Sequence, residues 1–175
     1  MTNPDPNAPE AAPAAPTDYP RKLADLVDVF RGMTDRTERI NLLIDMGKSF
    51  KPVAPEVAER PFPERHRVPH CESEAFVFAE PRPDGTLKFH FAVENPQGMS
   101  AMAAAVILDK GLSGQPRASV AATPPDIMYE IFGRELSMGK NMGLTGMVNM
   151  CRTLAAAAPA ASPAAGQVPA AEVAP

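Results

Sequence analysis

Residues 75–93 read AFVFAEPRPDGTLKFHFAV and decide the fold class. Residues 75–79 form a short apolar run, whereas residues 87–93 alternate between large apolar and smaller or polar side chains. Residues 83–85, Pro-Asp-Gly, favour a tight turn between the two runs. The segment therefore predicts an antiparallel β-hairpin. Its alternation predicts one face exposed to water and one face covered by helices.

The pattern upstream of this hairpin predicts two helices. Apolar residues recur at helical spacing over residues 23–30, and this helix is expected to end near Gly32. Asp35 and Glu38 have the spacing of a capping box, which predicts the start of a second helix. Gly47 indicates where that second helix ends.

The pattern downstream of the hairpin predicts three more helices. One covers residues 98–110, and one is opened by Thr123 as N-cap with Pro124 at its first position. The last covers residues 142–154, and the glycine-rich residues 139–146 are expected to form a turn that leads into it. Helices, a hairpin and further helices predict an α+β domain, a small antiparallel sheet flanked by helices.

Ala- and Pro-rich segments lie at both ends of the chain. Residues 1–20 contain five alanines and six prolines, and residues 155–175 contain eleven alanines and four prolines. Such segments cannot bury enough apolar surface to offset their ordering entropy, so we expect both to be disordered tails around a domain at residues 21–154. Because the formal net charge of −4 comes from the tails, the domain itself is balanced. A balanced domain argues against a nucleic-acid partner.

The sequence also bears on where the protein works. It contains no run of 18 apolar residues, so no membrane span is expected. A basic region followed by an apolar one, as in a secretory signal, is absent from the start of the sequence. Two cysteines in such a chain predict reduced thiols in the cytoplasm.

Cys71 is the main candidate for chemistry. It follows a long Pro-rich loop at residues 51–70 and directly precedes the first predicted strand, a position where reactive groups tend to lie. A thiolate is a strong nucleophile; a protonated His70 would stabilise it, and Glu72 and Glu74 would oppose its ionisation. The alternative is that Cys71 is a small packed residue, since free cysteines are often buried.

The other cysteine and the histidines suggest no second site. Cys151 shares the apolar stripe of the last helix and is expected in the core. The spacing of His66, His70, Cys71 and His90 matches no zinc-finger or zinc-ribbon pattern, so no metal site is predicted.

Three blocks of the chain resemble the SufE family of sulfur acceptors. Residues 35–48 are similar to the family's charged helix that ends in Leu-Gly-Lys. Residues 68–76, VPHCESEAF, are similar to its Gly-Cys-x-Ser block that enters a strand. Residues 140–147, KNMGLTGM, are similar to its stretch in which a basic residue precedes Gly-Leu and Met. The resemblance implies a fold like that of the IscU-type iron–sulfur scaffold proteins.

The resemblance also implies roles. Cys71 would carry a transient persulfide, with His70 beside it, Ser73 and Glu74 would shape its loop, and Lys140 stands where the family usually has an arginine. The partners would be a SufS-like cysteine desulfurase, which holds its own pyridoxal phosphate, and an iron–sulfur scaffold complex. The chain would need no cofactor of its own and would activate the desulfurase rather than act as a stand-alone enzyme.

The chain departs from the family pattern at four of these positions. His70 stands where glycine is usual, Glu72 where glutamine is usual, Phe76 where tryptophan is usual, and Lys140 cannot make the bidentate contacts of arginine. Two alternatives therefore stay open. One is a zinc-binding or iron–sulfur scaffold protein that uses Cys71 and nearby histidines. The other is a non-catalytic interaction domain on the same fold.

Overall fold

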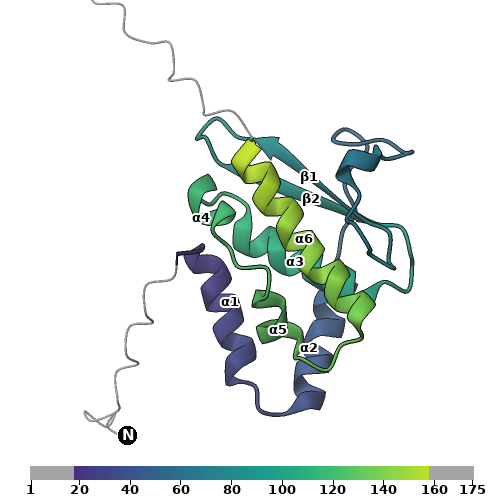
Figure 1. Ribbon diagram of the computed structural model, residues 1–175, viewed down its shortest axis with the longest axis vertical. Helices are drawn as coiled ribbons and strands as arrows, with labels where there is room; N and C mark the ends of the chain where they lie inside the picture. The colour runs from purple at the N-terminus through teal and green to yellow at the C-terminus, as the bar shows by residue number, and fades with distance from the viewer. Residues whose placement is uncertain (1–17, 158–175) are drawn as a thin grey trace, which may run out of the picture.

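The computed structural model describes residues 18–157, and the elements in that range follow the predicted order of helices, hairpin and helices (Figure 1). This order confirms the α+β prediction. The elements are α1 (Arg21–Gly32), α2 (Arg36–Lys48), the 3-10 helix η1 (Glu64–His66), β1 (Ala75–Pro81), β2 (Leu87–Val93), α3 (Met99–Leu112), α4 (Arg117–Ala121), α5 (Ile127–Phe132) and α6 (Met138–Ala157).

The predicted tails lie almost entirely outside the described residues. Where the two overlap, α6 continues past the expected boundary at Leu154 to Ala157, and Ala155 is buried. The folded part therefore extends slightly beyond residues 21–154. None of the helices within residues 18–157 has the length and apolar character needed to cross a membrane.

The hairpin forms as predicted. β1 and β2 pair in antiparallel register from Ala75 opposite Val93 to Pro81 opposite Leu87. In the turn, the Asp84 carboxylate accepts hydrogen bonds from the backbone N–H and the hydroxyl of Thr86. The turn chemistry of the sequence thus sets the register of the two strands.

The main core lies between the hairpin and the helices. Figure 1 shows α6 running along the hairpin, with α3 at the centre and α1 and α5 on its other side. Val77 and Phe89 of the hairpin, Ile107 of α3 and Met147 of α6 are each at most 1% exposed. Burial of each such side chain contributes about 1.5–3 kcal/mol of hydrophobic stabilisation.

The second face of the hairpin is not left to water, contrary to the prediction. Phe76, Phe78 and Ala92 point to this face and form a smaller buried cluster with Val53 of the long loop. The Phe62 ring also packs here, with its centroid 5.2 Å from that of Phe76. The loop therefore covers the sheet, which explains why residues 75–78 are apolar at every position.

A second correction concerns the helices after α3. Thr123 does not cap α5: it is fully buried, and its hydroxyl donates to the Ser119 carbonyl at 3.3 Å. It thereby satisfies a carbonyl of the short helix α4, which the sequence pattern did not predict. Residues 139–146 are not a turn but the first part of α6.

The start of α2 is confirmed and is tied to its neighbours. The Asp35 side chain accepts a hydrogen bond from the Glu38 backbone N–H at 2.8 Å, as a capping residue does. Arg39 then donates to the carbonyls of Phe30 at 2.7 Å and Glu130 at 3.0 Å, which lie in α1 and α5. One guanidinium thus joins three helices by satisfying carbonyls near helix ends.

Candidate functional site

Cys71 lies in a tight turn between the long loop and β1. The backbone N–H of Glu74 donates to the Cys71 carbonyl at 3.1 Å. His70, with φ 56°, and Glu74, with φ 48°, bracket the cysteine in the left-handed region of backbone space. Non-glycine residues adopt this region at a cost of about 1–3 kcal/mol, and such strain is concentrated at functional sites. Glycine would adopt the φ of position 70 without this strain, so His70 carries a conformational cost there.

Ser73 and Glu74 hold this turn against the segment after β2. The Ser73 carbonyl accepts from the Asn95 backbone N–H, and the Glu74 carbonyl accepts from the Glu94 backbone N–H, both at 3.2 Å. The Glu74 carboxylate also pairs with Arg67 at 3.2 Å. The part of the turn that follows Cys71 is therefore held to the segment after β2 by backbone hydrogen bonds, and to Arg67 by an ion pair.

The floor beneath Cys71 is a face of α6 made of glycines. A Cβ placed on Gly143 would lie 3.1 Å from Cys71 Sγ and 3.3 Å from its Cα. A Cβ on Gly146 would lie 2.8 Å from a Val68 methyl group, and one on Gly139 would overlap the Glu72 carboxylate. We call Gly139, Gly143 and Gly146 the glycine face. It allows the backbone around Cys71 to lie directly on the helix.

A cavity of about 240 Å³ opens beside the cysteine. Its wall comes from three places: the turn at residues 71–73, the segment and helix start at residues 95–101, and the first part of α6. Lys140 lines this cavity, and its side chain is exposed. His70 is also exposed, and it lines a second hollow with Cys71. The half-buried thiol therefore faces space that a reacting sulfur could enter.

Not all of the predicted site residues line the cavity beside Cys71. Cys71, Ser73 and Lys140 line one cavity, whereas Glu74 acts through the backbone and Arg67. The glycine face was not predicted, although its signal is present in the sequence. Glycines at positions 139, 143 and 146 follow helical spacing, which places them on one side of a helix.

Cys151 lies in the core, as predicted. It is fully buried on α6, and both cysteines are free thiols. Burial raises the pKa of the Cys151 thiol far above its usual range. It therefore stays protonated and is unsuited to nucleophilic chemistry.

The histidines do not gather around a metal. His66 donates through Nδ1 to the Val77 carbonyl at 3.0 Å and packs on Phe78, on the second face of the hairpin. The side chain of His90 contacts Glu80 at 3.2 Å. Within residues 18–157, no three His, Cys, Asp or Glu side chains are grouped so that they could hold a metal ion. The metal-binding alternative therefore gains no support from the described residues.

The chain is similar to SufE-like proteins in sequence and to one solved structure in fold. Two uncharacterized SufE-like proteins of Mycobacterium tuberculosis, from strains CDC 1551 and H37Rv, are each 26% identical over 117 residues, which is 67% of this chain and 78% of theirs. The solution structure of a hypothetical protein from Thermus thermophilus matches with a TM-score of 0.60 and 22% identity, covering 79% of this chain and 96% of that one. This likeness shows the fold.

The family comparison covers nearly the whole described domain. The sequence model of the family called SufE, the Fe-S metabolism associated domain, matches residues 24–155. That range includes the turn with Cys71 and the glycine face of α6. The chain therefore belongs to the SufE family.

Proposed function

We propose that this protein accepts sulfur as a persulfide on Cys71 from a pyridoxal-phosphate cysteine desulfurase and delivers it to iron–sulfur cluster assembly. The observation that carries the proposal is the position of Cys71. Hydrogen bonds hold its turn in place, and its thiol lies against the glycine face and beside an open cavity. Membership in a family associated with Fe–S metabolism supports the same role.

The proposed transfer is a thiol exchange. The Cys71 thiolate attacks the terminal sulfur of a persulfide on the desulfurase cysteine. A sulfur–sulfur bond forms at Cys71 while the bond to the desulfurase cysteine breaks. The electron pair of that bond leaves with the desulfurase thiolate, and the proton on the terminal sulfur stays with it. No external oxidant or reductant is needed, since the sulfane sulfur keeps its oxidation state.

The residues around Cys71 have distinct proposed roles. Ser73 and Glu74 hold the turn through the segment at residues 94–95. Lys140 offers a positive charge at the cavity, which would favour an anionic persulfide there. The glycine face leaves room beside Cys71 Sγ that side chains would otherwise fill.

Intact-mass spectrometry tests the proposal. The protein is mixed with its native cysteine desulfurase and cysteine, with and without a reductant. We expect the mass of one or more sulfur atoms to be gained, reversed by reductant and absent in Cys71→Ser. Cys151→Ala is the matched control and should gain sulfur as the unchanged protein does. If neither the unchanged protein nor the control gains sulfur, the proposal fails and a non-catalytic role on this fold takes its place.

A further inference from the structure

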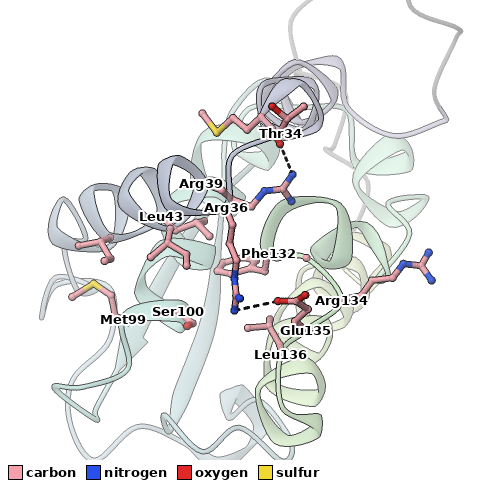
Figure 2. Close-up of a pocket in the computed structure, with 14 residues that line it drawn as sticks. Thr34, Arg36, Arg39, Leu43, Met99, Ser100, Phe132, Arg134, Glu135 and Leu136 are labelled. Atoms are coloured by element: carbon pink, nitrogen blue, oxygen red, sulfur yellow. Dashed lines mark hydrogen bonds and ion pairs between the residues drawn. The ribbon is translucent and has the colours of Figure 1, made fainter.

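A groove that adjoins the cysteine cavity lies between α2 and the segment that joins α5 to α6 (Figure 2). Its volume is about 580 Å³. Residues of α2 form one wall, residues 132–136 form the other, and Met99 and Ser100 at the start of α3 close one end.

The groove exists because α2 buries its apolar stripe only in part: Leu43 packs against the main core, whereas Ile40 and Ile44 do not belong to that cluster. Only Gly47 of this helix is fully buried. Ile40, Leu43 and Ile44 form the stripe and line the groove, and Ile40 is 43% exposed. A helix of a globular protein usually turns such a stripe toward the core. The exposed part of the stripe, around Ile40, is thus available to an external partner.

The rim of the groove carries more positive than negative charge. Arg36 of α2 reaches across the opening to Glu135 at 3.1 Å, and both side chains are 74% exposed (Figure 2). Such a pair contributes about 0–1 kcal/mol, so a carboxylate of a partner can take the place of Glu135. Arg134 has no ion pair within residues 18–157 and is turned away from the groove. The rim therefore suits a partner with acidic groups beside its apolar side chains.

The groove is continuous with the cysteine site. Met99 and Ser100 line both the groove and the cavity beside Cys71. On the other wall the chain passes into α6, where Met138 is 78% exposed and Met142 is 42% exposed. These two methionines alternate along the helix with glycines of the glycine face. Methionine adapts its shape to different partners, which makes it frequent at binding surfaces.

We propose that this surface, from Ile40 through Met138 and Met142, docks the protein that donates sulfur to Cys71. The occupant is an amphipathic segment of that donor, with apolar side chains between α2 and residues 132–136 and carboxylates near Arg36. A protein seated there lies next to the acceptor thiol, so it is the protein that exchanges sulfur with it. This inference rests on the proposed function and adds where and how the donor is recognised.

Affinity for the native desulfurase tests the inference without any sulfur chemistry. Titration calorimetry without cysteine gives the dissociation constant for the full chain and for Ile40→Glu and Arg36→Glu, whose exposed positions should tolerate the change. Matched controls are Val29→Glu, an apolar residue of α1 that is 50% exposed and outside the groove, and Arg21→Glu, another exposed arginine with an acidic partner.

We expect both groove variants to raise the dissociation constant about tenfold or more, and both controls to leave it unchanged. The affinity of the unchanged protein should fall with added salt, and that dependence should weaken in Arg36→Glu. At saturating desulfurase, the groove variants should gain sulfur to the same extent as the unchanged protein, because Cys71 is intact.

Two outcomes would overturn the inference: groove variants that bind as tightly as the controls, or variants whose sulfur gain at saturation is lost while their affinity is unchanged. Failure of the proposed function looks different. In that case no form of the protein gains sulfur, whatever its affinity for the desulfurase.

Discussion

The two cysteines of this chain are associated with the same helix in opposite ways. Cys151 belongs to α6 and points into the core, where no part of it is exposed. Cys71 comes from a distant turn and lies on α6 at Gly143, half-buried beside a cavity. Gly143 and Cys151 are about 12 Å apart along the helix at 1.5 Å per residue. The same helix therefore buries the Cys151 thiol in the core and supports the Cys71 thiol beside a cavity.

The difference shows that reactivity is decided by what surrounds the sulfur. Burial raises the pKa of the Cys151 thiol and excludes any partner. Cys71 instead lies in a strained turn, between His70 and Glu74 with positive φ, and next to space that another sulfur can enter. The exposed methionines and the glycine face lie in the first half of α6, and Cys151 lies in its second half.

Alkylation should separate the two thiols most strongly. With iodoacetamide under native conditions, we expect Cys151 to react at least about a hundredfold more slowly than Cys71, because its reaction requires the core to open at a cost of several kcal/mol. Peptide mass spectrometry of samples taken over time measures both rates. In denaturant the two rates should become similar. Equal rates under native conditions would contradict the contrast between the two environments.

A substitution at Gly143 should change how Cys71 packs on α6. Alanine there would gain about 0.5–1 kcal/mol of helix propensity, but its methyl group would press on Cys71 at an overpacking cost of about 1–3 kcal/mol. We therefore expect Gly143→Ala to lower the free energy of unfolding by up to about 2 kcal/mol. The turn should also be pushed outward, so that Cys71 alkylates several-fold faster. Denaturant unfolding and alkylation rates measure the two effects.

Gly32→Ala is the matched control, because nothing lies within 4 Å of a Cβ at this position in α1. It should keep the Cys71 alkylation rate and raise the free energy of unfolding by about 0.5–1 kcal/mol. If Gly143→Ala also kept the Cys71 alkylation rate and raised the free energy of unfolding, the Cys71 turn would not depend on close packing against the glycine face.

Local patterns predicted much of this architecture. The turn chemistry of residues 83–85 and the alternation of residues 87–93 gave the hairpin, and the Asp35–Glu38 spacing gave the start of α2. These signals act between neighbours in sequence, so they can be read without knowing the packing. The prediction that Cys71 carries the chemistry rests on a signal of the same kind, because this cysteine stands between a long loop and a strand.

Contacts between distant segments were not predictable in this way. Phe62 covers the second face of the hairpin, and no local pattern indicates where a loop residue will pack. Residues 139–146 were interpreted as a turn because glycine has a low helix propensity. In the structure these residues are helical, and the glycines at 139, 143 and 146 allow the Cys71 turn to approach α6 closely. The groove along α2 was not predictable either, because the spacing of Ile40, Leu43 and Ile44 is the same as that of a stripe buried in the core.

Substitution of Lys140 should give the smallest of the expected effects, a modest change in the rate of sulfur uptake. It lines the cavity beside Cys71 but is exposed, so its interaction with an anionic sulfur is screened by water and salt. At low salt we expect Lys140→Ala to slow sulfur uptake by about two- to fivefold, which is the range for an exposed charge interaction of up to about 1 kcal/mol. Lys140→Arg should stay close to the unchanged protein, because the charge is kept.

Rates of sulfur gain at several salt concentrations check this, with Lys22→Ala on α1 as the matched control. The effect of Lys140→Ala should shrink as salt is added, because the electrostatic attraction is what the variant loses. A slowing that is independent of salt would show that the Lys140 side chain supports the packing of the cavity instead. No slowing at low salt would leave the fastened turn and the glycine face as the features that distinguish Cys71 from Cys151.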